Sequence, residues 1–164
     1  MTTEPNPPNE NETLRQSFLP EHIATLFVGE SAPDGPRFFY KGNGSLFNEL
    51  KKLLRGSDNF LAEFRQRGFY LDDLVPYPVD HMERKDRRLH CKQAVPSLAA
   101  RLRTYRPQAI VIIGRGVDEL IRKAAQDAGF KGPIYATPFP GRPEHREQFR
   151  QDIAACVAQL PTAK

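Results

Sequence analysis

Apolar and polar positions along the chain form two kinds of pattern: short continuous apolar runs, and longer segments with helical spacing. The continuous runs occupy residues 24–29, 69–75, 109–114 and 133–139. Each is short, contains β-branched or aromatic residues and is bounded by glycine or proline, which is typical of buried strands. The run AIVIIG at residues 109–114 is apolar throughout, so we expect both of its faces to be covered.

Helical spacing fills the intervals between these runs. Leucines recur at this spacing in residues 46–54, and other apolar residues do so in 60–64, 98–105, 117–128 and 149–160. Alternation of strands and helices predicts a parallel sheet with helices on both faces. We therefore predict an α/β fold, a three-layer α/β/α sandwich around a central, mostly parallel four-stranded sheet.

The N-terminus differs from the rest of the chain in composition. Residues 1–18 are rich in Pro, Asn, Glu and Thr and have few apolar side chains, so we expect a disordered tail. Residues 19–164 would then form one domain with a sizeable core. No apolar run reaches membrane-spanning length and no apolar signal segment opens the chain, so we expect a cytoplasmic protein without a membrane partner.

The formal net charge of +4 is unevenly distributed. Residues 1–22 carry −3, and the rest of the chain carries +7. Such a basic body is attracted to polyanions such as DNA by a salt-sensitive force. Charge alone fits equally well a basic protein that has no nucleic-acid partner.

The chain has two cysteines, Cys91 and Cys156, and no Cys-x-x-Cys pair. A zinc or iron–sulfur centre held by cysteines is therefore not expected, and we predict no metal and no cofactor. The sequence Gly114-Arg115-Gly116 follows an apolar run, but it lacks the third glycine of a dinucleotide-binding fingerprint.

Polar, aromatic, glycine and proline residues gather where the predicted strands end. These segments are residues 29–44, 75–88, 114–117 and 137–146. In open parallel sheets, ligands bind in the crevice beyond the carboxyl ends of the strands. We expect the four segments to converge on one site.

Four stretches, in chain order, resemble signatures of the uracil-DNA glycosylase superfamily: LFVGESAPDGPRFFY, GFYLDDLVPYP, YRPQAIVIIGRGVDELI and ATPFPGRPEHREQF. The resemblance covers about residues 23–160 and is more specific for fold than for activity. It implies a DNA glycosylase that hydrolyses the bond between the sugar and a uracil or other damaged base, after the nucleotide has rotated out of the duplex. The lack of four ligand cysteines implies a branch without an iron–sulfur cluster, and we expect a monomer with DNA as its partner.

The resemblance also implies roles for residues after the first strand. Glu30 matches the carboxylate that supports the sugar cation or orients water, and Gly29 and Ser31 would flank backbone donors to the base oxygen. Phe38 matches the ring that stacks on the base, with Phe39 as its neighbour. The structural alternatives are a capping carboxylate and aromatic rings that fill the core.

Two positions depart from the family pattern. Asp73 lies where the family has an asparagine that reads the base edge, and Asp72 and Asp80 compete for this assignment. An ionised aspartate offers only acceptors, which suits the uracil carbonyl poorly. Thr137 replaces the family histidine that bears charge on the departing base; His145, eight residues later, is the candidate substitute, or else a surface or capping histidine.

Basic residues follow the second and fourth strands. Arg84 and Arg88, and Arg142 and Arg146, are candidate contacts to DNA phosphates; the alternative is ordinary solvated helix faces. The favoured function is base excision. Rival functions are a catalytically silent module that binds nucleic acid or a nucleotide, which the departures at Thr137 and Asp73 favour, and a hydrolase of free nucleosides.

Overall fold

A computed structural model describes residues 10–163 of the chain and contains one four-stranded sheet. The strands are β1 (Thr25–Gly29), β2 (Phe69–Asp73), β3 (Ala109–Ile113) and β4 (Ile134–Thr137). Their spatial order is β2-β1-β3-β4, and every neighbouring pair is parallel. All four apolar runs that predicted strands are strands in the structure.

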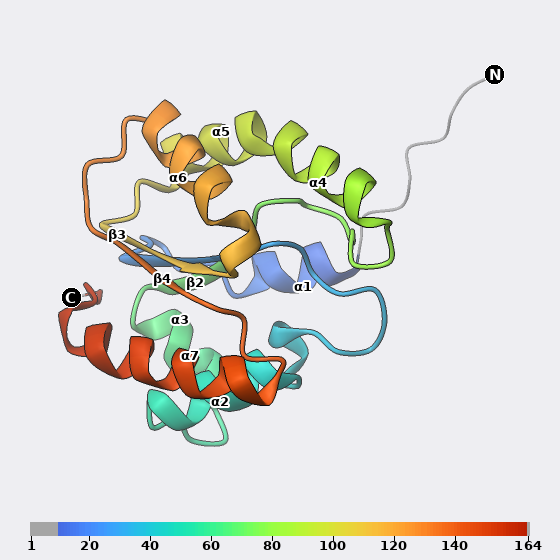
Figure 1. Cartoon of the computed structure of the whole chain (residues 1–164). Helices are drawn as coiled ribbons and strands as arrows, with labels where there is room; N and C mark the ends of the chain where they lie inside the picture. The colour runs from blue at the N-terminus through green and yellow to red at the C-terminus, as the bar shows by residue number, and fades with distance from the viewer. Residues whose placement is uncertain (1–9, 164) are drawn as a thin grey trace.

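Helices cover both faces of the sheet (Figure 1). One face carries α2 (Ser45–Leu53), α3 (Phe60–Gln66) and α7 (Pro143–Cys156), and the other carries α4 (Arg84–Gln93), α5 (Val95–Tyr105) and α6 (Asp118–Asp127). Short 3-10 turns occur at η1 (Phe39–Lys41), η2 (Arg115–Val117) and η3 (Val157–Gln159). The predicted three-layer α/β/α sandwich is confirmed.

The register of the sheet brings the carboxyl ends of β1 and β2 level. Gly29 pairs with Asp73, and the ladder continues beyond both strands because Val75 N–H donates to the Glu30 carbonyl at 2.9 Å. β1, β2 and β3 are buried at every position, as expected for central parallel strands between helical layers. The segments that leave β1 and β2 are therefore fixed side by side.

An aromatic cluster forms the core beneath α2 and α3. Phe39 is buried and its ring lies 5.2 Å from that of Phe64 and 5.0 Å from that of Tyr40. Phe27, Phe47, Phe60 and Phe69 complete the cluster. Phe39, which was predicted to bind substrate beside Phe38, has its ring in the hydrophobic interior.

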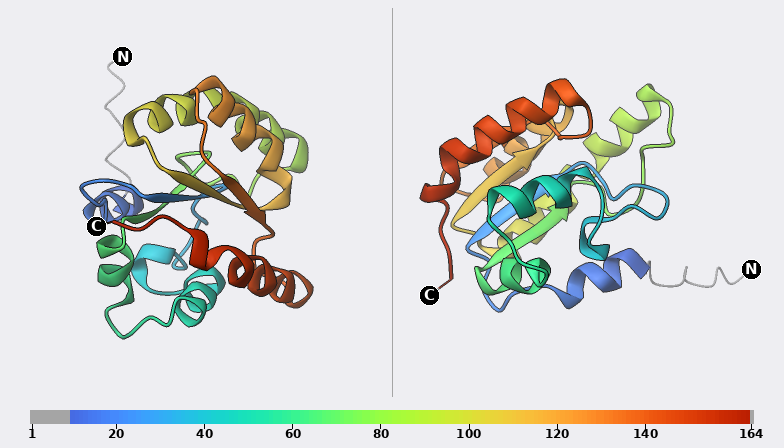
Figure 2. Two further views of the ribbon diagram at one scale, coloured as in Figure 1. Left: turned by 90° about the vertical axis from the view of Figure 1, so that its left-hand side faces the viewer. Right: turned by 90° about the horizontal axis from the view of Figure 1, so that it is seen from below.

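The N-terminal segment differs from its prediction. Residues 1–18 were expected to form a disordered tail, but Glu10–Ser17 form the helix α1. Residues 1–9 lie outside the described part of the chain. Helix α1 lies at the edge of the sheet beside β2, outside the two helical layers (Figure 2). Polar composition did not predict this ordered helix, because the main buried side chain of α1 is a charged one, Arg15, which is 1% exposed.

None of the helices within residues 10–163 combines the length and apolar character that are needed to span a membrane.

Truncation of the core ring tests the aromatic cluster. We expect Phe39→Ala to lower the free energy of unfolding by about 3–5 kcal/mol, because it removes a buried ring and leaves a cavity. Phe139→Ala is the matched control, since this ring is 49% exposed, and it should change stability by less than about 1 kcal/mol. Urea denaturation measures both, and equal losses in the two variants would contradict the core position of Phe39.

Candidate functional site

The first component of the site is the close approach of Gly29 to Asp73 at the ends of β1 and β2. A Cβ atom at Gly29 would lie 2.7 Å from Oδ1 of Asp73, which is too short for any real contact. The glycine of the first signature is therefore required by the space that the Asp73 carboxylate occupies. This contact places the carboxylate directly over the exit of β1.

The structure separates Asp73 from its neighbour Asp72. Adjacent side chains of a strand point to opposite faces, and Asp72 faces α5, where it accepts hydrogen bonds from Arg101 at 2.8 Å and from the Tyr105 hydroxyl at 2.9 Å. Asp80 is exposed and accepts a hydrogen bond from the backbone N–H of Asp34 at 3.3 Å. Of the three aspartates that competed for the base-edge position, Asp73 is the one that lies over Gly29.

Arg15 from α1 connects Asp73 to Phe38. Its Nη2 donates to Oδ2 of Asp73 at 2.7 Å, and its Nη1 donates to the Leu71 carbonyl at 2.7 Å. The guanidinium carbon lies 5.3 Å from the centre of the Phe38 ring, within the range of a cation–π contact. The two residues proposed to hold a base thus flank a single planar group, which is supplied by the chain itself.

Electrostatics favour the charged form of Arg15. Burial alone would lower the pKa of this guanidinium, but the carboxylates of Asp73 and Asp72 outweigh burial and raise it. For Asp73, burial raises the pKa of the carboxyl, and Arg15 partly offsets that effect. A buried carboxylate without a partner is strongly unfavourable, so the pair holds α1 against the sheet.

Phe38 is less accessible than its loop position suggested. The side chain is 3% exposed and packs edge-on against Tyr40 at 5.9 Å between ring centres. The side chain of Asn43 holds the loop, because its Oδ1 accepts from the Phe38 N–H at 2.7 Å. The expectation of an exposed stacking ring is corrected: Arg15 covers the Phe38 ring, and all three aromatics of the Phe38-Phe39-Tyr40 run are buried.

Glu30 is held by α4 on the opposite side of the β1 exit. Arg87 donates to Oε1 of Glu30 from Nε at 2.8 Å and also from Nη2, and the Cys91 thiol lies 3.7 Å from Oε2. The hydrogen bond to Glu30 raises the pKa of Arg87. Glu30 is a paired carboxylate at the expected strand end, with a quarter of its side chain (25%) exposed.

Sequence reasoning selected Arg84 and Arg88 from the basic run as candidate DNA contacts and did not predict that Arg87, in the same run, pairs with Glu30. Helical spacing held the missing signal, because Arg87 and Cys91 are four residues apart and share one face of α4. That face turns toward Glu30, whereas Arg84 and Arg88 are exposed. Arg15 was missed for a different reason, since it lay in the segment that was predicted to be disordered.

Ser31 has a structural contact. Its hydroxyl oxygen accepts a hydrogen bond from the backbone N–H of Val79 at 3.3 Å, which joins the segments that follow β1 and β2.

The end of β4 forms a separate part of the surface. Thr137 is buried, and its hydroxyl has no hydrogen-bond partner among residues 10–163. His145 is half-buried in the first turn of α7. Within the described chain, no hydrogen bond or ion pair joins either side chain to Glu30 or Asp73. A cavity of about 270 Å³ adjoins Thr137, and its lining includes Arg115, Asp118, Ala136, Pro138, Gln148 and Asp152.

The two arginines near α7 have different surroundings. Arg142 is exposed at the start of the helix. Arg146 Nε lies 3.4 Å from the Pro140 carbonyl and 3.9 Å from the buried carboxylate of Glu49, so it connects the β4–α7 loop to α2. Arg142 is therefore the more available of the two for a phosphate.

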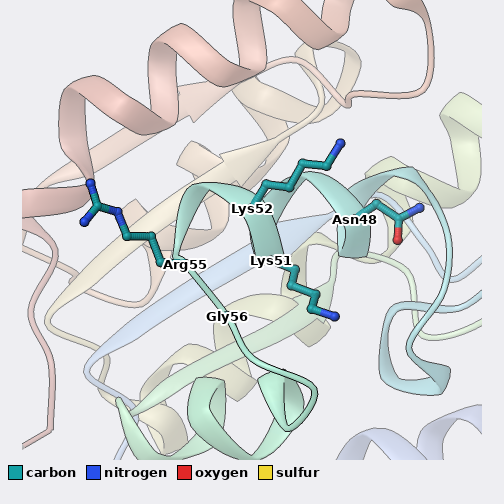
Figure 3. A pocket seen from close by; sticks show the side chains of 5 residues that line it. All are labelled: Asn48, Lys51, Lys52, Arg55 and Gly56. Carbon is teal, nitrogen blue, oxygen red and sulfur yellow. The ribbon is translucent and has the colours of Figure 1, made fainter.

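A second cavity, of about 470 Å³, lies at the end of α2 and is lined by Asn48, Lys51, Lys52, Arg55 and Gly56. Figure 3 shows that the three cationic side chains diverge instead of pointing to a common centre. The described residues also contain no group of three or more His, Cys, Asp or Glu side chains that could hold a metal ion.

Comparison with known proteins identifies the family. A search among curated proteins finds no match. The family model of the uracil DNA glycosylase superfamily matches residues 16–159, which include all four strands and helices α2 to α7. The chain therefore belongs to the uracil-DNA glycosylase superfamily.

Proposed function

We propose that the protein is a DNA glycosylase that hydrolyses the N-glycosidic bond of uracil or a related deaminated or damaged base. One observation carries the proposal beyond family membership: Phe38 and Asp73 flank one planar group at the carboxyl ends of β1 and β2, where ligands bind in such sheets. A ring on one side and hydrogen-bonding oxygens at the edge are the contacts that a flipped base requires.

Glu30 is the proposed catalytic carboxylate. As the bond between the sugar C1′ and the base nitrogen breaks, the electron pair leaves with the base and positive charge develops on the sugar ring. A carboxylate near C1′ stabilises that charge and orients a water, whose oxygen bonds to C1′ and whose proton passes to the departing base. The pairing with Arg87 reduces the field of Glu30, so Arg87 tunes this stabilisation.

Negative charge on the departing base needs donors in place of the missing histidine. Backbone N–H groups near Gly29 and Ser31 are proposed to serve this role, together with the imidazole of His145 in the first turn of α7. Thr137 offers a hydroxyl without a partner in the described chain. Asp73 is proposed to read the base edge: ionised it accepts hydrogen bonds, and protonated it both donates and accepts, as an asparagine amide does.

Exposed cations are proposed to hold the DNA backbone. Arg84 and Arg88 project from α4 beyond the β2 exit, and Arg142 precedes α7. Such contacts position the substrate and make its affinity fall with salt. DNA is accordingly the proposed partner.

A second candidate function is a catalytically silent module that binds nucleic acid or a nucleotide. The observation that favours it is the ion pair of Glu30 with Arg87, together with the occupied space between Phe38 and Asp73. A silent module would bind DNA without releasing any base.

Base release tests the proposed activity. At low salt, the protein should release uracil, hypoxanthine or xanthine from single- or double-stranded oligonucleotides. Glu30→Gln should lower the rate about 100-fold or more, because an amide cannot support the sugar cation as a carboxylate does. The matched control is Glu119→Gln on α6, where the side chain is exposed and the rate should not change. A protein that binds these oligonucleotides and releases no base would contradict the glycosylase proposal and support the silent module.

Thiol reactivity tests the placement of Glu30 independently of activity. Burial and the Glu30 carboxylate raise the pKa of the Cys91 thiol to about 11. The reactive thiolate is therefore scarce near neutral pH and becomes abundant only as the pH rises toward that value. We expect Glu30→Gln to lower the Cys91 pKa and to speed its alkylation by iodoacetamide at pH 8.5.

Cys156 is the internal control in the same samples. Burial also raises its pKa, but Glu30 is not among the groups that act on it. Peptide mass spectrometry should show faster modification at Cys91 only. Equal acceleration at both cysteines would indicate general loosening of the fold and contradict a specific contact between Glu30 and Cys91.

A further inference from the structure

The position of Arg15 carries an inference that rests on the proposed base site. Its guanidinium faces the Phe38 ring and donates to Asp73 and to the Leu71 carbonyl. A guanidinium is planar, stacks on aromatic rings and carries N–H donors along its edge. A nucleobase that stacked on the same ring and turned its edge toward the same acceptors would have these properties too. Arg15 therefore faces the Phe38 ring and pairs with Oδ2 of Asp73, which are two contacts that a base in this position would make.

We propose that α1 is an internal plug: Arg15 occupies the base position, and a flipped nucleotide must displace α1 before it can enter the site. Arg15 is 1% exposed, so no base can share the space between Phe38 and Asp73 while it remains. The affinity for a base is then reduced by the fraction of molecules in which the position is open.

The anchoring of α1 is compatible with displacement. Helix α1 has eight residues and lies at the free edge of β2, outside the two layers that cover the sheet (Figures 1 and 2). Besides Arg15, the contacts of α1 and the residues that follow it include packing of Leu14 against the core, a hydrogen bond from Arg65 to the Leu19 carbonyl, and stacking of Phe18 on Tyr40 at 5.3 Å between ring centres. Most of α1, Arg15 included, precedes the matched family segment that begins at residue 16. The plug thus comes from outside the part of the chain that forms the sandwich.

When α1 is displaced, Asp73 keeps a hydrogen-bond partner only if the incoming group takes the place of the Arg15 guanidinium. A base that presents N–H donors can do so, whereas a sugar–phosphate backbone without a base cannot. The exchange is therefore specific to a base-bearing nucleotide. This requirement distinguishes a plug from a permanent cap of the β2 edge, which would stay in place whichever ligand binds.

Hydrogen exchange on the unaltered full chain gives the direct test. The probe is a single-stranded oligonucleotide with one central 2′-fluoro-2′-deoxyuridine, in which the fluorine slows cleavage by destabilising the sugar cation. The control is the same oligonucleotide with an abasic analogue at that position. We expect amides of residues 10–17 to exchange faster with the first oligonucleotide than with the second. Saturating binding of both with unchanged α1 protection would overturn the proposal.

Variants that weaken the plug provide a second test, in which base binding should increase. Arg15→Leu removes the occupant, and Phe18→Ala loosens α1 while leaving the ion pair with Asp73 intact. Both should raise the preference for the uracil-bearing over the abasic oligonucleotide about tenfold or more, measured by fluorescence anisotropy. Gln16→Ala, at an exposed position of the same helix, should leave the preference unchanged. Loss of a buried ion pair can prevent folding. If Arg15→Leu does not fold for this reason, Phe18→Ala and the hydrogen-exchange experiment still test the plug.

The outcomes separate this proposal from the proposed activity. A gain in base-dependent binding without any base release would support the plug and contradict the glycosylase. Base release by the wild-type protein with α1 fully protected throughout binding would support the glycosylase and overturn the plug. No gain in either folded variant would overturn the plug as well.

Discussion

The close approach of Gly29 and Asp73 is the constraint on which the site depends. The parallel register of β1 and β2 sets these residues opposite each other, and the missing side chain of Gly29 leaves room for the Asp73 carboxylate. A carboxylate in that position lies away from water and needs a cation. Arg15 supplies the cation, and its own burial fixes α1 against the edge of the sheet.

This buried pair contributes to stability and has the opposite effect on function under the proposed plug. Removing one member of a buried pair is unfavourable by about 3–5 kcal/mol, since the other charge is left without a partner. The same pair fills the space next to the Phe38 ring with a group of the chain itself. Under the proposed plug, the guanidinium that stabilises a buried carboxylate at this strand end also closes the base site. The proposal therefore couples stability and access to a ligand through one guanidinium.

Glu30 presents the same arrangement on the other side of the β1 exit. Its carboxylate is paired with Arg87, and Cys91 lies within 3.7 Å. Both carboxylates near this strand end are therefore neutralised by arginines from helices that are distant in sequence, α1 and α4. Each arginine is separated from its carboxylate by more than fifty residues, so only the fold brings the charges together.

Local pattern determined the sheet and the two helical layers, but it did not predict helix α1. Continuous apolar runs predicted all four strands, and the helical spacing between them predicted the layers on either side, because buried parallel strands and amphipathic helices follow from side-chain periodicity alone. The ordered motifs indicated the family that the match over residues 16–159 shows.

Tertiary structure decided what the site residues contact: Phe38 is buried under Arg15, Phe39 belongs to the core, and Glu30 is paired. Periodicity could not reveal these contacts, since a buried ion pair depends on two charges that meet only after distant segments have packed.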